Sequence, residues 1–229
     1  MPPRKKEPED LAAKKALALE VIARLKKEYP DAGCTLDYDH AWQLLVSVRL
    51  AAQCTDARVN IVVEDLFAKY SNVAALAAAE PEDIEAIVKP CGLGHSKARD
   101  ISACMRMLRD KYDCQVPTTF EELLSLPGVG RKSANLIMGD VFGKPAIVTD
   151  THCIRLCNKI GLVDGIKEPQ KVEMALWKII PPEEGSDLCH RFVMHGRAVC
   201  NARKPECEKC CLNDVCRYAR EQSGEKAAQ

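Results

Sequence analysis

The chain has 229 residues, and its 33 lysines and arginines balance its 33 aspartates and glutamates, so that the formal net charge is zero. A hydrophobic content of 47% is typical of a globular protein and excludes an intrinsically disordered chain. No apolar run approaches the roughly 20 residues of a membrane span, and the N-terminal MPPRKKEPED lacks the apolar region of a secretory signal. We therefore expect no membrane association, and a reducing compartment in which the 13 cysteines do not form a disulfide framework.

Apolar residues at helical spacing, abundant alanine and leucine and few aromatics predict an almost entirely helical chain. The predicted helices lie at 9–28, 41–52, 56–70, 81–88, 96–112, 119–126, 131–140, 151–160, 168–180 and 186–199. Thr55 is expected to cap the third of these helices, and Thr118 with Glu121 fits a capping box for the sixth. Residues 147–149 form the only plausible strand fragment, which is too short to build a sheet.

Residues 126–134 read LPGVGRKSA and predict two helices joined by a tight turn. Gly128 and Gly130 allow a phosphate to approach the backbone N–H groups at the start of the second helix, where the helix dipole favours an anion. Lys132 lies in the first turn of that helix, where the same field favours the uncharged, nucleophilic form of its amine. An exposed lysine without a role fits this local pattern equally well.

Residues 148–152 read VTDTH and precede another predicted helix. Asp150 suits the N-cap of that helix, and it also suits a carboxylate that orients or deprotonates a nucleophile or a water. One helix and a short return separate Lys132 from Asp150, which allows the two side chains to come together.

A cysteine cluster near the C-terminus has the spacing C-x6-C-x2-C-x5-C, and it consists of Cys200, Cys207, Cys210 and Cys216. Thiolates are soft ligands, so this spacing indicates a metal or iron–sulfur site. Residues 190–204 contain four lysines and arginines and no acid, which indicates either a surface for an anionic partner or a solvated face. The nine other cysteines are expected to be small buried hydrophobes or incidental surface thiols.

The hairpin sequence LPGVGRKSA, the segment VTDTH and the cysteine spacing together resemble the endonuclease III family of helix-hairpin-helix DNA glycosylases. The resemblance covers about residues 15–218, and LAAQCTD at 50–56, GLGHSKA at 92–98 and HGRAVC at 195–200 add to it. It implies an all-α, two-lobed fold. A six-helix barrel domain at 33–144 would carry the hairpin, and residues 1–32 and 145–229 would form an iron–sulfur cluster domain.

The resemblance also implies a reaction. Lys132 would attack C1′ of a damaged pyrimidine nucleotide in duplex DNA, expel the base and form a Schiff base, and β-elimination would then nick the strand 3′ to the lesion. Asp150 would assist the nucleophile or stabilise the positive charge on the sugar, across a cleft from Lys132. A helix-hairpin-helix module that binds DNA without catalysis is the alternative, although binding alone needs neither residue.

Further roles follow from the same resemblance. Gln53 would fill the gap that the extruded nucleotide leaves, and Leu93 would wedge into the duplex, although locally a solvated Gln and a packed Leu are the simpler interpretations. Contacts to DNA are assigned to Gly128, Gly130, Arg131, His152, Arg203 and Lys204.

The four cysteines of the cluster would hold a [4Fe-4S] group that folds a basic loop. Zinc is the competing ligand, but zinc sites usually pair two short C-x2–4-C units, and Cys211 falls outside the family spacing. The expected partner is double-stranded DNA with a damaged pyrimidine or an abasic site. The expected protein is a monomer in the bacterial cytoplasm, associated with the nucleoid when it is bound to DNA.

Overall fold

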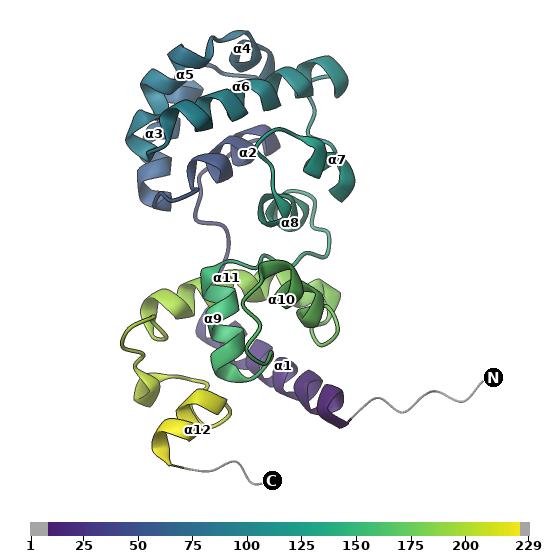
Figure 1. Ribbon diagram of the computed structural model, residues 1–229, viewed down its shortest axis with the longest axis vertical. Coiled ribbons are helices and arrows are strands. Elements are labelled where there is room, and N and C mark those ends of the chain that lie inside the picture. The colour runs from purple at the N-terminus through teal and green to yellow at the C-terminus, as the bar shows by residue number, and fades with distance from the viewer. Residues whose placement is uncertain (1–8, 225–229) are drawn as a thin grey trace, which may run out of the picture. The chain divides into compact units, whose positions relative to one another are not determined.

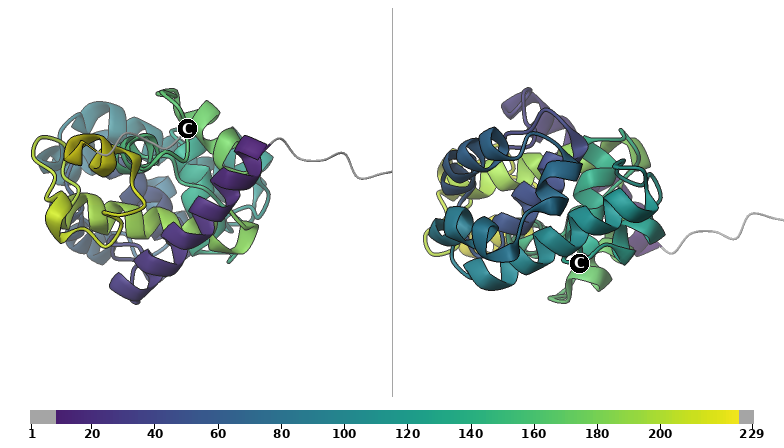
Figure 2. Two further views of the ribbon diagram at one scale, coloured as in Figure 1. Left: turned by 90° about the horizontal axis from the view of Figure 1, so that it is seen from below. Right: turned by 90° about the horizontal axis from the view of Figure 1, so that it is seen from above.

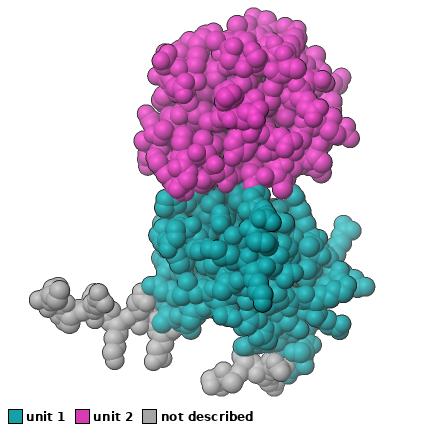
Figure 3. All heavy atoms as spheres, turned by 180° about the vertical axis from the view of Figure 1, so that it is seen from behind, with its two compact units in different colours: residues 1–33, 145–229 teal, residues 34–144 magenta. Residues whose placement is uncertain are grey.

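The structure, a computed structural model, describes residues 9–224 and divides the chain into two compact units. One unit consists of residues 34–144, and the other of residues 1–33 together with 145–229 (Figures 1 and 3). Every regular element of the described residues is a helix, and the further views in Figure 2 show only coiled ribbons and loops. None of the described helices is both long and apolar enough to cross a membrane.

The unit of residues 34–144 is a group of helices around α6 (Gly94–Lys111), which packs against α2, α4 and α5. Its other elements are α2 (Ala41–Leu50), α3 (Asp56–Lys69), α4 (Val73–Ala78), α5 (Pro81–Val88), the 3-10 helix η1 (Lys89–Cys91), α7 (Phe120–Ser125) and α8 (Arg131–Asp140). The nearly apolar sequence of α2 is explained by its position, because α3, α6 and α8 all contact it. The predicted cap of α3 is confirmed, since the Thr55 side chain accepts from the backbone N–H of Arg58.

The structure corrects the ends of two predicted helices in this unit. Helix α2 ends at Leu50 rather than at 52, because the chain turns at Gln53, whose φ of 58° is incompatible with an α-helix. Helix α6 begins at Gly94 rather than at Ser96, with Leu93 as its left-handed N-cap residue.

Two further corrections concern the cap of α7 and the presence of α4. The N-cap residue of α7 is Thr119, one residue later than predicted: the Glu122 N–H donates to Oγ1 of Thr119, and this hydroxyl, rather than the Thr119 backbone N–H, donates to the Glu122 carboxylate. Helix α4 was not predicted. It has only six residues and is held by the Asn72 side chain, which accepts from the Ala75 N–H at 2.8 Å.

The second unit packs α11 (Gly185–Ala198) against α1 (Glu9–Glu28) and α9 (Thr151–Ile160). Its other elements are α10 (Pro169–Leu176), the 3-10 helices η2 (Pro182–Glu184) and η3 (Cys207–Lys209), and α12 (Arg217–Ser223). Helix α10 ends four residues before the predicted 180, in a turn that leads to Pro181 and Pro182. Helix α12 was not predicted, and residues 147–149 are extended but form no strand.

Helix α1 holds the segment that carries the cysteine cluster. The Arg24 guanidinium pairs with Asp214 and donates to the carbonyl of Cys211 at 3.0 Å. The Tyr29 hydroxyl lies 3.1 Å from Nδ1 of the buried His195 on α11. These contacts explain why the N-terminal helix belongs to the same compact unit as residues 145–224.

Candidate functional site

The turn between α7 and α8 is the hairpin that LPGVGRKSA predicted, and it rests on buried Leu126. Gly128 has a φ of +74°, which is the left-handed region that favours glycine. A Cβ atom at Gly128 would lie 2.8 Å from Cβ of Asp100, so the turn also approaches α6 too closely for a side chain. Gly130 is the N-cap residue of α8, and it provides no side chain to accept from the first N–H groups of that helix.

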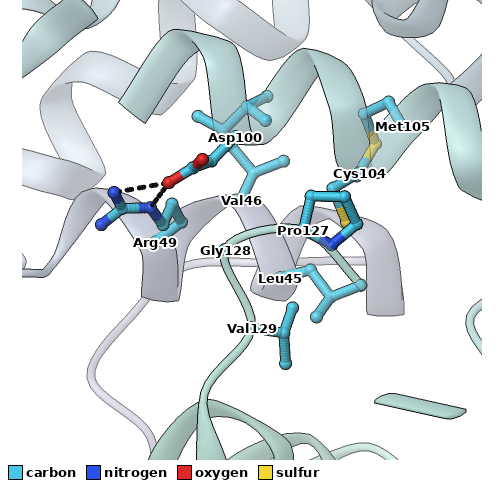
Figure 4. A pocket seen from close by; sticks show the side chains of 10 residues that line it. Leu45, Val46, Arg49, Asp100, Cys104, Met105, Pro127, Gly128 and Val129 are labelled. Atoms are coloured by element: carbon cyan, nitrogen blue, oxygen red, sulfur yellow. Dashed lines mark hydrogen bonds and ion pairs between the residues drawn. The ribbon is translucent and has the colours of Figure 1, made fainter. Parts of the chain in front are cut away.

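An ion pair packs against the hairpin at Gly128 (Figure 4). Nε of Arg49 on α2 donates to Oδ2 of Asp100 on α6 at 2.7 Å, and Gly128 lies against both side chains. Together with the apolar residues around it, the pair lines a small pocket next to the turn. Arg49 and Asp100 were not among the candidate residues, because no local pattern shows that residues so far apart in the chain meet next to the hairpin.

Substituting Gly128 by alanine is expected to lower the free energy of unfolding by about 2 kcal/mol, because of the left-handed backbone and the close approach to Asp100. Gly130→Ala is the matched control, since its φ is −97° and a Cβ there would meet nothing within 4 Å. Urea denaturation of the two variants measures the difference. Equal free energies of unfolding for the two variants would show that the turn does not require glycine at position 128.

Lys132 is the second residue of α8, and its side chain is exposed. Arg131, immediately before it, is half-buried and places its guanidinium 4.9 Å from the centre of the Phe120 ring, a cation–π contact that joins α8 to α7. The fold therefore fixes the start of α8 while the Lys132 amine stays accessible to a substrate.

Asp150 is the N-cap residue of α9, as one of the two interpretations of its sequence predicted. Its Oδ1 accepts from the backbone N–H of Cys153 at 2.7 Å. The preceding segment is fixed because Val148 is buried and its N–H donates to the Cys189 sulfur at 3.2 Å. The cap holds the carboxylate in one orientation at the start of a helix, which is compatible with a catalytic role as well.

His152 is half-buried between α9 and α11. Its Nδ1 lies 3.2 Å from Nη2 of Arg155, and the same guanidinium nitrogen donates to the carbonyls of Gly196 and Cys200. A Cβ atom at Gly196 would come within 2.4 Å of the His152 ring, so the close packing of the two helices depends on this glycine. A contact between His152 and DNA stays a prediction.

The four cysteines predicted as ligands line one cavity, which is partly open to solvent. Cys211 is not among the residues that line it. Nε2 of His195 lies 3.3 Å from the Cys210 sulfur. His195 therefore connects Tyr29 to one of the cysteines that line the cavity.

The surroundings of this cavity raise the pKa of three of its thiols. Burial raises the pKa of Cys200 and Cys216, and a hydrogen bond with Cys211 together with burial raises the pKa of Cys210 to about 12. Within residues 9–224, no three His, Cys, Asp or Glu side chains converge closely enough to hold a single metal ion. All four cysteines nevertheless line the same cavity, which is compatible with a shared polynuclear ligand.

The remaining predicted DNA contacts lie on exposed segments. Gln53 is exposed in the turn after α2, and the Leu93 side chain is 58% exposed before α6. Arg203 and Lys204 are exposed in the loop after Cys200, where the Lys204 N–H donates to the Asn201 side chain at 2.8 Å.

Comparison with known proteins decides the family. The model of the HhH-GPD superfamily of base excision DNA repair proteins matches residues 46–182. Endonuclease III of Synechocystis sp. is 43% identical over 207 residues, which cover 90% of this chain and 94% of that protein. The chain belongs to the endonuclease III family. The family member of Escherichia coli K12 is 37% identical over 204 residues, covering 89% of this chain and 96% of that protein.

Solved structures agree with this assignment. A trapped endonuclease III–DNA covalent intermediate is 40% identical and superimposes with a TM-score of 0.86, covering 91% of this chain and 98% of that one. A thermostable thymine-DNA glycosylase has a TM-score of 0.80 at 21% identity, which shows a shared fold. The predicted all-α fold and the predicted enzyme class, a DNA glycosylase of base excision repair, are thus confirmed for this endonuclease III family member.

Proposed function

We propose that this chain binds duplex DNA that contains an oxidised pyrimidine or an abasic site and acts on it as a bifunctional DNA glycosylase and AP lyase. The observation that supports this most strongly is the exposed Lys132 in the first turn of α8, directly after the glycine hairpin. A relative with the same fold and 40% identity has been captured as a covalent intermediate with DNA, which requires a nucleophile of this kind.

The proposed chemistry begins at C1′ of the damaged nucleotide. The neutral amine of Lys132 forms a bond to C1′ while the glycosidic bond breaks and the base leaves with the bonding electron pair. Loss of the amine proton and opening of the sugar ring give a Schiff base. Removal of a C2′ proton then expels the 3′ phosphate, and water releases the lysine. Asp150 stabilises the positive charge that develops on the sugar and accepts the amine proton.

Binding to DNA is assigned to both units. In residues 34–144, the N–H groups at the start of α8, next to Gly128 and Gly130, and the Arg131 side chain contact phosphates. In the other unit, Arg203 and Lys204 contact phosphates and His152 lies near the substrate. We propose on this basis that the two units are two functional domains, one with the hairpin and one with the cysteine cluster.

The nucleotide must leave the base stack before Lys132 reaches it. Gln53 is proposed to fill the resulting gap and Leu93 to wedge into the stack. An exposed leucine in a left-handed backbone, with a φ of 51°, has no evident packing role and fits this function.

A [4Fe-4S] cluster is the group that fits the cysteine cavity. Its ligands would be Cys200, Cys207, Cys210 and Cys216, which line one cavity, and their spacing differs from the two short C-x2–4-C units of usual zinc sites. When bound, the cluster crosslinks the loop that carries the exposed Arg203 and Lys204 and so orients their charges.

Replacing Cys207 by serine is expected to remove most of the bound iron and the visible absorbance of the anaerobically purified protein. Cys211→Ser is the matched control, because Cys211 adjoins Cys210 but does not line the cavity, and its iron and sulfide content should equal that of the unsubstituted protein. A colourless protein that contains zinc would refute the cluster.

The function itself is tested by borohydride trapping on a duplex that contains thymine glycol. A covalent adduct and a nick 3′ to the lesion are expected. Specific binding without an adduct or release of the base would indicate a helix-hairpin-helix module without catalysis. The monomeric state and the cytoplasmic location stay predictions.

A further inference from the structure

Lys97 is the only buried lysine among the described residues, and its side chain is fully inaccessible to solvent. It lies in the first part of α6, where burial lowers the pKa of its amine. Placing an ammonium group in a protein interior costs several kcal/mol unless specific partners compensate, as a general rule. The partners of Lys97 therefore indicate what this lysine does.

The amine joins two segments of backbone that are far apart in the sequence. Nζ of Lys97 donates to the carbonyl of Leu50 at 2.8 Å and to the carbonyl of Cys91 at 2.8 Å. Leu50 ends α2, and a cation is favourable among the unsatisfied carbonyls at a helix C-terminus. Cys91 ends η1, so one side chain caps two elements at the same time.

Each of these two segments leads directly to a residue with a left-handed backbone. Gln53 follows Leu50 by three positions with a φ of 58°, and Leu93 follows Cys91 by two positions with a φ of 51°. The backbone N–H of Lys97 also donates to the Leu93 carbonyl at 3.0 Å. Lys97 thus holds the Leu93 segment through both its backbone and its side chain.

The left-handed conformation is costly for both residues. Such a conformation costs a residue other than glycine about 1–2 kcal/mol, and it persists only where the surroundings enforce it. Among the described residues, only Gln53, Leu93, Asp113 and Cys114 have a positive φ without being glycine. The Cys54 and Cys91 thiols of the same two segments also interact, and Cys54 helps to raise the pKa of Cys91.

We infer that Lys97 is a positioning residue that joins the Gln53 and Leu93 segments into one preformed element for insertion into the DNA duplex. This inference rests on the proposed function, in which these two side chains fill the gap and wedge the stack. A preformed element reduces the entropy that is lost when two exposed loops become ordered on DNA. A lysine suits this role because its ammonium group has three donors and no acceptor, and a methionine of similar length has no donor.

The test compares Lys97→Met with the unsubstituted protein on two substrates that contain the same abasic site. On duplex DNA, the single-turnover rate of borohydride trapping is expected to fall about tenfold or more, because the inserting side chains are misplaced. On single-stranded DNA the rate should change less than about twofold, because there is no stack to open. The fluorescence of 2-aminopurine opposite the abasic site should rise less with the variant than with the unsubstituted protein.

Leu108→Ala is the matched control for lost stability. Leu108 is fully buried on the same helix, and truncating it is expected to lower the thermal stability of the protein without removing a contact to the Leu50 or Cys91 carbonyl. The ratio of duplex to single-strand trapping should be unchanged in this variant. If Leu108→Ala changes the ratio as much as Lys97→Met does, or if Lys97→Met leaves it unchanged, the inference is wrong.

A double-mutant cycle gives a second, independent measurement. In a protein that already carries Gln53→Ala and Leu93→Ala, Lys97→Met should cause little further loss on duplex DNA, whereas Leu108→Ala should act as it does alone. If Lys97→Met does not fold, Lys97→Gln replaces it in both experiments. Its side-chain amide is shorter but still donates, so the trapping rate on duplex DNA is expected to fall less than the tenfold expected for Lys97→Met. Full additivity of Lys97 with the two loop residues would overturn the inference. Absence of trapping by the unsubstituted protein would refute the proposed function instead.

Discussion

Lys132→Ala is expected to abolish the covalent adduct with DNA under borohydride and to lower base excision by on the order of 10³-fold or more, because the nucleophile is lost. The stability of the protein should change by less than about 0.5 kcal/mol, since the side chain is exposed on the first turn of α8. Alanine is a good helix former, and removing a cation from a helix N-terminus is slightly favourable. Gel analysis of trapped complexes and a thermal denaturation curve measure the two effects.

Lys111→Ala is the control for Lys132→Ala, because Lys111 is an exposed lysine of the same unit that lies outside the proposed site. It should trap DNA as the unsubstituted protein does. An adduct that survives Lys132→Ala at full yield would exclude Lys132 as the nucleophile, and the lyase mechanism would then need another amine.

Asp150→Asn is expected to lower the rate of base excision by about 10²–10³-fold, because the carboxylate no longer stabilises the positive charge on the sugar. Asparagine caps a helix about as well as aspartate, so the hydrogen bond from the Cys153 N–H and the fold of α9 should persist. The loss should be smaller on a preformed abasic site, where no glycosidic bond has to break. Single-turnover rates on the two substrates measure this difference.

Asp150→Ala separates the cap from the catalysis at this position. This variant loses the cap as well as the charge, and it should be about 1 kcal/mol less stable than Asp150→Asn while excising bases at a similarly low rate. If Asp150→Asn retains full activity and only Asp150→Ala is impaired, the aspartate is a structural cap and has no catalytic role.

Local sequence patterns predicted most of the helices, because amphipathic spacing and capping residues act within one or two turns. The Thr55 cap, the opening of α5 at Pro81 and the hairpin at residues 126–134 are of this kind. The predictions were wrong where contacts between distant residues, or patterns too short to recognise, determine where a helix begins or whether it forms. The six-residue α4 is too short for a periodic pattern, and α6 starts early because Leu93 is held in a left-handed conformation.

The sequence by itself determined the helical class, the hairpin, the candidate nucleophile and the cysteine spacing, since each depends on a pattern within a short stretch of the chain. Only the tertiary structure showed that the four cysteines line one cavity, and that Arg49 and Asp100 pair next to Gly128. It also gave Lys97 a role, because the two carbonyls that the lysine joins are 2.8 Å from its amine but belong to segments on different elements. Such pairings depend on how helices pack, and packing brings together residues whose separation along the chain carries no local signal.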